Sequence, residues 1–229
     1  MAGVIEFGEL TTPLVADACV RAGVALRVAP AGVRPVTAGM RVAGRARPVR
    51  HYGSVDVFLE AYGDAGPGDV LVIDNGGRSD EACIGDLTVL EAAAAGVAGL
   101  VVWGLHRDTR ELAEIGVPVF SYGALAAGPL RVDPRDDAPV RFGGHVVTGE
   151  DLVLADDDGV LFIPGDRAGE VLAVARAIHE TEREQARRIT AGETLRQQTR
   201  FAEYLARRRE DPQYTFRQHL RRIGGAIEE

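Results

Sequence analysis

Residues 68–108 read GDVLVIDNGGRSDEACIGDLTVLEAAAAGVAGLVVWGLHRD, and this stretch decides the fold. Two apolar runs, at 70–73 and 100–103, flank a segment with helical character, and each run leads into glycines and charged residues. Strand, glycine-rich turn, helix, strand and charged loop is the order in which α/β proteins build sites at the carboxyl ends of their strands. We therefore expect an α/β fold whose functional residues follow these two strands.

Composition bounds the class of protein. A chain of 229 residues, 46% of them hydrophobic, can form a substantial domain, expected over 1–190, and a helical, arginine-rich extension over 191–229. The net charge of −8 disfavours a nucleic-acid partner. No apolar run approaches the roughly 18 residues of a membrane span, and the start of the chain, with Glu6 and Glu9, lacks a secretory pattern. We expect a cytoplasmic protein with no membrane partner, in which the isolated Cys19 and Cys83 are reduced.

The absence of lysine restricts the chemistry. All 26 basic residues are arginine. A lysine imine with a carbonyl substrate, a lysine-bound pyridoxal phosphate and a standard phosphate-loop lysine are therefore excluded within this sequence. Carbonyl chemistry here needs another electrophile, and a metal ion is the one we favour.

Periodicity and turn residues predict the remaining elements. Helices are expected at 8–23, 54–62, 86–95 and 109–115, and strands at 70–73, 100–103, 117–120, 151–155 and 159–163, with further β pairing around 140–147. The turn at Asp156-Asp157-Asp158-Gly159 carries a strong hairpin signal. A calcium loop is the alternative, but the spaced ligands and the closing glutamate are absent, so we favour the hairpin.

Two helices have predicted packing faces. In the helix at 54–62, Val55, Phe58 and Leu59 share a face. The helix at 86–95 is expected to pack inward through its leucines, with Leu87, Leu90 and Ala94 among the buried residues.

The C-terminal part reads as helices. A long amphipathic helix is expected over 168–189, Gly192 interrupts it, and 193–209 resumes the helical pattern. This appendage is too small to bury its apolar face alone, so we expect it to pack on the body or on another subunit. The run 207–209 of three arginines favours a solvated or inter-subunit face over contact with nucleic acid.

Three residues in the opening stretch have a joint chemical logic. Asp86 begins a helix, and Arg107 and Asp108 follow the next strand, so the three are expected to converge. Arginine offers a planar fork to a carboxylate, and a helix N-terminus offers N–H groups to the same anion. A carboxylate can hold a divalent cation that keeps positions open for water and substrate. The set suits a 2-oxo acid whose enolate is stabilised by a metal.

Two alternatives concern the same residues. Spacing alone favours an arrangement without a functional role, in which Arg107 and Asp108 form a surface ion pair and Asp86 caps a helix. The triplet 106–108 also mimics a kinase catalytic loop, but Ala113 stands where that motif needs asparagine, so we reject this interpretation. The other histidines, His51, His145, His179 and His219, show no ligand spacing and are interpreted as structural or surface residues.

At this point the sequence resembles a known family. The stretches LTTPLVADA (10–18), PGDVLVID (67–74), GDLTVLEAAAAGVAGLVVWGLHRD (85–108) and LVLADDDGVLFIP (152–164) resemble the RraA-like family. The family includes 4-hydroxy-4-methyl-2-oxoglutarate aldolases, which also decarboxylate oxaloacetate, and regulators of ribonuclease E activity. The resemblance spans roughly residues 8 to 180, and the paired G-D and R-D elements are its most specific part.

The resemblance implies a fold, an assembly and roles. The fold would be the β/β/α swivelling domain, assembled into homotrimers or hexamers with sites near subunit interfaces. Gly85, Asp86, Leu87 and Thr88 would form the substrate loop. Arg107 would bind the substrate carboxylate, and Asp108 would bind Mg²⁺ or Mn²⁺. Asp86 would orient a water for proton transfer, and its presence favours the catalytic branch of the family.

One departure concerns an acid that the family's aldolases draw from a neighbouring subunit. Glu180, Glu182 and Glu184 are the candidates, and the sequence does not choose among them. The leading hypothesis is a metal-dependent carbon–carbon lyase acting on 2-oxo acids. The rivals are a non-catalytic regulator that binds a ribonuclease, and a lyase for a different hydroxy-oxo acid whose specificity the extension sets.

Overall fold

A computed structural model describes residues 8–130 and 132–224. Two compact units form, Met1–Val171 and Leu172–Glu229, and each is described by itself. The expected domain boundary after residue 190 stays a prediction. Glu6, used above for the N-terminal pattern, and the last five residues of the extension lie outside the described residues.

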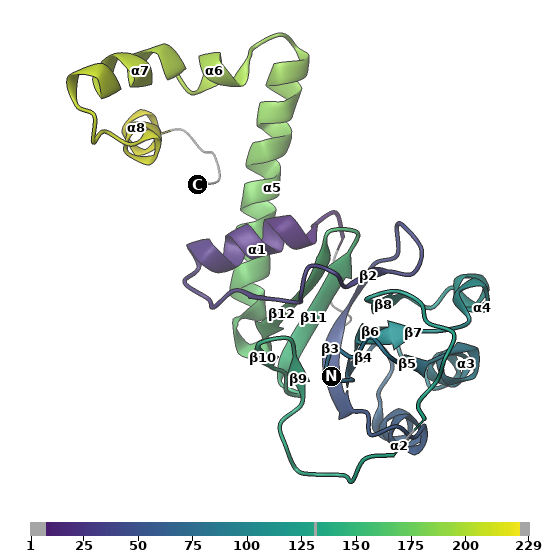
Figure 1. Ribbon diagram of the computed structural model, residues 1–229. Helices are drawn as coiled ribbons and strands as arrows, with labels where there is room; N and C mark the ends of the chain where they lie inside the picture. Colours follow the sequence, from purple (N-terminus) through teal and green to yellow (C-terminus); the bar gives the residue numbers. More distant parts are fainter. Residues whose placement is uncertain (1–7, 131, 225–229) are drawn as a thin grey trace. The chain divides into compact units, whose positions relative to one another are not determined.

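The first unit is built on an eight-stranded mixed sheet with the order β1-β12-β11-β3-β4-β6-β8-β2 (Figure 1). Its strands are β1 (Arg27–Val28), β2 (Arg34–Pro35), β3 (Val42–Arg50), β4 (Val70–Asp74), β6 (Gly99–Trp103), β8 (Val119–Ser121), β11 (Asp151–Asp156) and β12 (Gly159–Pro164). The strands β3, β4, β6 and β8 run parallel, whereas β11 pairs antiparallel with β3. The carboxyl ends of the parallel strands therefore meet at one edge.

The expected buried strands are confirmed at the centre of this sheet. Every residue of β4 is buried, and side chains alternate between faces, as the strand geometry requires. Val70 and Val72 join the core on one face, with Phe120, Phe142 and Phe162. Their neighbours Leu71 and Ile73 join the core on the other face, with Phe58 and Val89. A strand buried on both faces is apolar throughout, which explains the unbroken run at 70–73.

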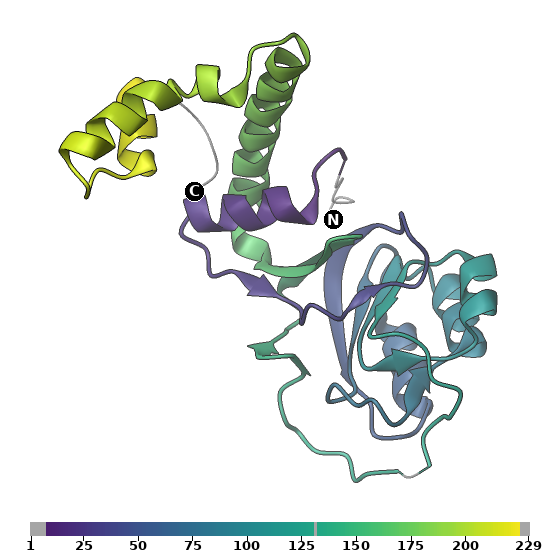
Figure 2. The ribbon, with the colours of Figure 1, turned by 45° about the horizontal axis from the view of Figure 1, so that its top comes forward.

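Helices α2 (Asp56–Asp64), α3 (Asp86–Ala94) and α4 (Thr109–Ile115) lie on one side of the sheet in both ribbon views (Figures 1 and 2). The bounds of α4 match the expected range, and Gly116 ends the helix in the left-handed conformation at φ 77°. Each helix connects parallel strands, as crossover connections require.

The predicted packing face of α3 is wrong, and the face predicted for α2 is confirmed only at Phe58. In α3 the buried residues are Val89 and Ala92, whereas Leu87 and Leu90 are 75% and 49% exposed. In α2, Val57, Phe58 and Tyr62 are buried, while Val55 and Leu59 are about half exposed. Several helical registers can align apolar residues in such sequences, and small side chains such as Ala92 let a helix approach the sheet closely. Leucines were therefore a poor guide to the inward face.

The predicted hairpin at 151–163 is confirmed. Asp156 pairs with Gly159 across a two-residue turn between β11 and β12. The Asp156 carboxylate accepts hydrogen bonds from the backbone N–H and hydroxyl of Thr12, at 2.7 and 2.6 Å, and from the N–H of Asp158. Thr12 begins α1 (Thr12–Arg21), so Asp156 ties this helix to the hairpin. The helix buries an apolar stripe of Leu14, Val15, Ala18 and Cys19.

Short ladders complete the unit. The strands β9 (Arg141–Phe142) and β10 (His145–Val146) pair as a hairpin, in agreement with the pairing expected around 140–147. The strands β5 (Ala82–Ile84) and β7 (Leu105–His106) form a parallel pair that the sequence did not predict.

The C-terminal helices are α5 (Ala168–Thr190), α6 (Leu195–Gln198), α7 (Phe201–Glu210) and α8 (Phe216–Ile223). The helix expected over 193–209 is divided, because Arg200 adopts the left-handed conformation at φ 47°. Side chains of α7 and α8 form an aromatic cluster in which Tyr204 contacts Phe216 at 5.0 Å and His219 at 5.7 Å between ring centroids. Packing of this unit on the body or on another subunit stays a prediction.

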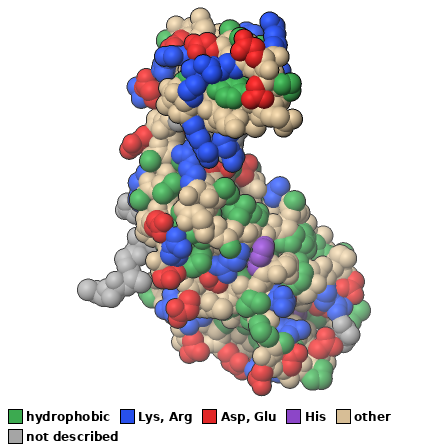
Figure 3. Space-filling model, turned by 90° about the vertical axis from the view of Figure 1, so that its left-hand side faces the viewer, with side chains coloured by type: hydrophobic (Ala, Val, Ile, Leu, Met, Phe, Trp, Pro, Cys, Tyr) green, Lys and Arg blue, Asp and Glu red, His purple; other side chains and the backbone are tan. Residues whose placement is uncertain are grey.

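Charged side chains of both signs are interspersed over the face that Figure 3 shows. In the C-terminal helices, Arg188 pairs with Glu193 and Arg222 with Glu203. Among the residues that the structure describes, no helix is both long enough and apolar enough to cross a membrane.

Candidate functional site

The β5–β7 pair brings the two charged segments together. Ile84 lies beside His106 in this ladder, and the backbone N–H of Arg107 donates to the carbonyl of Ile84 at 3.0 Å. Gly85 follows β5 directly and is the N-cap of α3, while Arg107 follows β7. The loop that begins at Gly85 and the loop that begins at Arg107 are therefore neighbours.

The predicted convergence of Asp86, Arg107 and Asp108 is confirmed. The Oδ2 atom of Asp108 accepts a hydrogen bond from the backbone N–H of Asp86 at 3.3 Å. The same oxygen lies 3.3 Å from the Nε atom of Arg107. The Asp108 carboxylate thus meets the positive end of α3 and a guanidinium together.

Asp108 has an unusual backbone conformation. Its φ of 59° and ψ of 41° place it in the left-handed region, which aspartate tolerates better than most residues. Asp108 is the N-cap of α4, yet its side chain makes no capping bond to that helix. The left-handed turn instead directs the carboxylate to α3.

Gly85 allows the side chains of Arg107 and Asp108 to pack closely against the backbone. A Cβ atom at this position would lie 2.3 Å from Oδ2 of Asp108 and 3.1 Å from Nε of Arg107. The φ of Gly85 is −150°, so steric clearance and not backbone freedom requires glycine here. Gly128 plays a similar part on the other side, where a Cβ would lie 3.1 Å from a terminal nitrogen of Arg107.

The Arg107 side chain is available to a ligand. It is 51% exposed, and its ion pair uses Nε. Its terminal nitrogens take part in no hydrogen bond or ion pair among the described residues. A half-exposed pair of this kind contributes about 0–1 kcal/mol to stability. The same contacts also fit the alternative of a surface ion pair beside a helix end.

The first turn of α3 presents the predicted loop. The Thr88 hydroxyl accepts from the N–H of Gly85 at 3.1 Å and donates to the Gly85 carbonyl at 2.7 Å. The Asp86 carboxylate accepts from the N–H of Leu87 at 2.7 Å. Leu87 is the exposed apolar residue beside these polar groups. The loop thus combines helix-end donors, one carboxylate and an apolar side chain.

His106 is a buried residue that the sequence analysis did not assign to the site. It is 4% exposed, and both ring nitrogens have partners, the hydroxyls of Ser121 at 2.6 Å and of Thr109 at 3.0 Å. Burial lowers the pKa of His106, and the negative charge of Asp108 opposes this shift. The only sequence signal was the polar residue in an otherwise apolar strand end, which was considered as part of a kinase-like triplet.

The one carboxylate of Asp108 fits Mg²⁺ better than a metal ion whose ligands all come from the protein. Within the described ranges 8–130 and 132–224, no group of three or more histidine, cysteine, aspartate or glutamate residues is arranged to hold a metal ion. Mg²⁺ commonly takes one or two protein carboxylates and fills its other positions with water and substrate oxygens. The single carboxylate of Asp108 would be compatible with this pattern.

Cavities in the described part of the chain lie away from these residues. One, of about 230 Å³, is lined by His51, Asn75 and Glu81, among others. Nδ1 of His51 lies 2.9 Å from Oδ1 of Asn75, and burial lowers the pKa of His51. The structural interpretation of His51 agrees with this burial.

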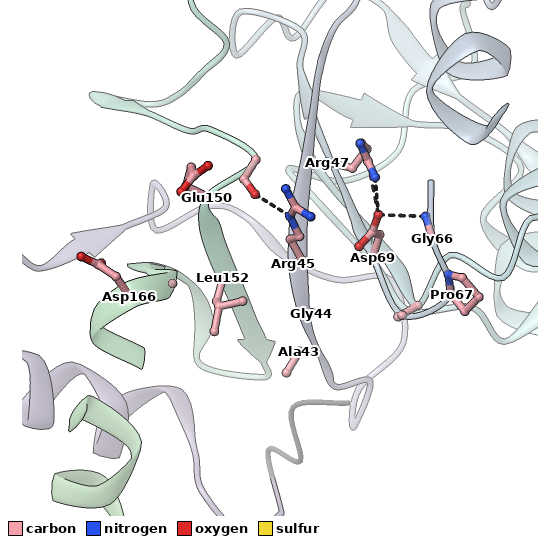
Figure 4. Close-up of a pocket in the computed structure, with 14 residues that line it drawn as sticks. Ala43, Gly44, Arg45, Arg47, Gly66, Pro67, Asp69, Glu150, Leu152 and Asp166 are labelled. Atoms are coloured by element: carbon pink, nitrogen blue, oxygen red, sulfur yellow. Dashed lines mark hydrogen bonds and ion pairs between the residues drawn. The ribbon is translucent and has the colours of Figure 1, made fainter. Parts of the chain in front are cut away.

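The second cavity, of about 580 Å³, lies between β3, the turn before β4 and the start of β11 (Figure 4). Arg45 donates from Nε to the carbonyl of Gly149 at 2.6 Å. Arg47 is paired with Asp69, which also accepts from the N–H of Gly66. None of the predicted site residues lines this cavity.

Comparison with known proteins now decides the family. A family model named RraA-like, described as Aldolase/RraA, matches residues 12–162. The chain belongs to the RraA-like family. The resemblance seen in the sequence and the expected RraA-like α/β fold are thereby confirmed.

Three relatives illustrate the family's range. Protein DlpA of Legionella pneumophila is 33% identical over 173 residues, which cover 72% of this chain but only 28% of DlpA. A protein of Halalkalibacterium halodurans named "Putative 4-hydroxy-4-methyl-2-oxoglutarate aldolase" is 34% identical, over 63% of this chain and 70% of that protein. The crystal structure of Streptomyces coelicolor RraAS2, described as an unusual member of the RNase ES inhibitor RraA protein family, is similar with a TM-score of 0.68 and 28% identity, covering 82% of this chain and 96% of that one.

Proposed function

We propose that this chain is a divalent-metal-dependent lyase that cleaves carbon–carbon bonds of 4-hydroxy-2-oxo acids, of the 4-hydroxy-4-methyl-2-oxoglutarate type, to pyruvate. Oxaloacetate decarboxylation would be a second activity of the same site. The observation that carries the proposal is the contact of Asp108 with both the Asp86 N–H and Arg107, each at 3.3 Å. Membership of a family described as Aldolase/RraA and the name of the Halalkalibacterium relative support it.

Asp108 would hold Mg²⁺ or Mn²⁺. Its Oδ2 atom is engaged by Asp86 and Arg107, so Oδ1 is the natural ligand atom. When bound, the cation supplies the positive charge against which negative charge develops on the 2-oxo oxygen of the substrate. The absence of lysine supports this role for a metal, because no lysine imine can form in this chain.

Arg107 and the loop 85–88 would bind the substrate carboxylate. The terminal nitrogens of Arg107 form the planar fork that matches a carboxylate. The N–H groups at the start of α3 add hydrogen bonds and the favourable end of the helix dipole. Gly85 allows the substrate to approach the backbone because it has no side chain. Leu87 would contact the apolar part of the substrate.

Asp86 would orient a water that carries the proton. In the cleavage, the water takes the proton from the 4-hydroxyl group, and the new carbonyl forms at C4. The C3–C4 bond breaks, and its electron pair becomes the enolate of pyruvate, which is then protonated at C3. The carboxylate of Asp86 would suit this role, because Asp86 is the first residue of α3 and its backbone N–H contacts Asp108.

The proposed assembly is a cytoplasmic homotrimer or hexamer with the site near an interface. The high exposure of Leu87 and Leu90 beside the site supports an oligomer, because a partner would cover these leucines. One of Glu180, Glu182 or Glu184, all on α5, would supply the further acid to a neighbouring subunit. The helical extension after residue 190 would influence which substrate enters.

The test is a pyruvate-release screen with the purified protein. The panel contains oxaloacetate and a series of 4-hydroxy-2-oxo acids, each with Mg²⁺, with Mn²⁺ and with EDTA. The proposal expects metal-dependent pyruvate from at least one member. Pyruvate release at the same rate in EDTA would contradict the proposal. No release from any member of the panel would favour the alternative, a non-catalytic regulator.

The alternative is a non-catalytic regulator that binds a ribonuclease. The description of the Streptomyces relative as a member of the RNase ES inhibitor family favours it. This alternative expects a stable complex with a ribonuclease, and loss of ribonuclease activity, without any pyruvate release. We rank the lyase first because the chain has an acid at position 86, which the resemblance associates with the catalytic branch of the family.

A further inference from the structure

The His106 side chain bridges three elements around the site. It projects from β7, and its Nδ1 atom lies 2.6 Å from the hydroxyl of Ser121 at the end of β8. Its Nε2 atom lies 3.0 Å from the hydroxyl of Thr109, the first residue of α4. Because His106 is 4% exposed and Ser121 is 2% exposed, water hardly competes for these bonds.

The hydrogen-bond network assigns the direction of each bond. The Ser121 oxygen accepts from the N–H of Gly123 at 3.1 Å, and its own proton points to Nδ1 at 2.6 Å in preference to the Gly123 carbonyl at 3.4 Å. Nδ1 is then the acceptor, and Nε2–H donates to Thr109. The imidazole ring therefore connects the end of β8 to the start of α4 through one hydrogen bond at each ring nitrogen.

Hydrogen bonds hold both neighbours of Asp108 in the chain, Arg107 and Thr109. The N–H of Arg107 is held by the Ile84 carbonyl at 3.0 Å, and the side chain of Thr109 is held by His106. Between them, Asp108 adopts a left-handed conformation that costs roughly 1–3 kcal/mol. Its carbonyl accepts the first hydrogen bond of α4, from the N–H of Leu112 at 2.9 Å, but its side chain makes no capping bond to that helix. The surrounding contacts must maintain the turn.

We infer that His106 is a positioning residue, which acts through Thr109 to hold Asp108 in the left-handed turn that directs its carboxylate to the start of α3. The inference rests on the proposed function, in which Asp108 is the metal ligand. Relaxation of the turn would move the carboxylate from the Asp86 N–H and from Arg107. Metal affinity would then fall although no ligand atom has been removed.

The test compares two substitutions of the same residue. Thr109→Val keeps the shape of the side chain and removes the hydroxyl, whereas Thr109→Ser keeps the hydroxyl. The dissociation constant of Mn²⁺ is measured by electron paramagnetic resonance for the wild type and both variants, with melting temperatures recorded in parallel. We expect Mn²⁺ to bind about 10-fold more weakly to Thr109→Val, the scale of supporting contacts at metal sites. Thr109→Ser should restore affinity to within about 2-fold of the wild type.

The possible results distinguish the positioning role of His106 from the proposed metal-dependent function. Equal Mn²⁺ affinity of Thr109→Val and wild type would overturn the positioning role and leave the proposed function intact. Weaker binding by Thr109→Val and Thr109→Ser alike would also overturn it, because the hydroxyl would then not be responsible. No Mn²⁺ binding by the wild type would instead overturn the metal-dependent function itself. Ser121→Ala provides a second variant, and the inference expects it to weaken Mn²⁺ binding in the same direction.

Discussion

The Oδ2 atom of Asp108 lies 3.3 Å from the backbone nitrogen of Asp86, so the N-cap residue of α4 directs its carboxylate to the start of α3. The two residues are 22 positions apart in the chain and meet because β5 and β7 pair side by side. A carboxylate held by a helix end and by Arg107 is oriented before any ligand arrives. This relationship underlies the predictions that follow.

Asp108→Asn removes the negative charge and keeps the size of the side chain. We expect metal dependence to disappear and kcat/KM to fall by about 100-fold or more, because a bound metal contributes several kcal/mol to stabilisation of developing charge. Kinetics with a titration of Mg²⁺ measure the effect. Asp80→Asn, on an exposed aspartate paired with Arg78, is the control and should behave as wild type. Wild-type kinetics of Asp108→Asn would show that the metal ligand is misassigned.

Arg107→Lys keeps the positive charge and loses the planar fork. We expect KM for the 2-oxo acid to rise by roughly 10- to 100-fold, as loss of a charge-assisted hydrogen bond costs about 1.5–3 kcal/mol. Arg107→Ala should be more severe than Arg107→Lys. Steady-state kinetics measure both variants. An unchanged KM in Arg107→Ala would exclude this residue as the carboxylate-binding group.

Gly85→Ala introduces a Cβ where only 2.3 Å separates it from the Asp108 carboxylate. The added methyl group must displace Asp108 or the start of α3, so activity should fall by at least about 10-fold, since small misplacements of reacting groups are costly. Gly63→Ala is the matched control in α2, because nothing lies within 4 Å of its Cβ position. The control should keep full activity with equal or higher stability. Comparable activity in the two variants would contradict the tight fit at Gly85.

His51 should make stability depend on pH. Burial lowers its pKa from the ordinary value of 6.5, while the hydrogen bond to Asn75 and the charge of Glu81 oppose the shift. Because the unfolded chain then binds the proton more readily, the stabilisation is complete above pH 6.5 and is lost as pH falls through the lower pKa of the folded state.

His51→Gln removes this titration. Between about pH 7 and 5, the free energy of unfolding of the wild type should therefore fall faster than that of His51→Gln, by at most about 1.4 kcal/mol per pH unit for a single proton. Urea unfolding at a series of pH values measures the difference. Parallel pH profiles for the two proteins would rule out His51 as the source.

Sequence patterns predicted those elements whose signals are local. The apolar runs of β4 and β6 indicated buried strands, and Gly116 marked the end of α4. The hairpin around Asp157-Asp158 followed from its turn residues. Such features depend on residues that are neighbours in the chain, which explains why they could be recognised without the structure.

Features that depend on distant partners were missed or wrong. The pairing of β5 with β7 needs segments more than 20 residues apart, and two strands this short carry no periodicity of their own. The left-handed conformations of Asp108 and Arg200 occur at residues other than glycine, so composition gave no warning. The inward face of α3 was misplaced because Val89 and Ala92, and not the larger leucines, contact the sheet.

In the candidate site, too, some features follow from the sequence and others depend on residues that are distant in the chain. The positions of Asp86, Arg107 and Asp108 around successive strands predicted that they converge, while their roles stay predictions. The role of His106 depends on hydroxyls from Ser121 and Thr109, which only the folded chain brings to its two nitrogens. The orientation of the Asp108 carboxylate likewise depends on a backbone conformation that the sequence does not reveal.

The most direct test of the central claim is metal removal and restoration, with pyruvate release as the readout. The protein is treated with EDTA, freed of the chelator, and assayed with oxaloacetate and with 4-hydroxy-4-methyl-2-oxoglutarate before and after addition of Mg²⁺ or Mn²⁺. We predict that pyruvate release stops after EDTA treatment and returns when either ion is added, in the wild type but not in Asp108→Asn. Undiminished pyruvate release from the metal-free protein would contradict the account.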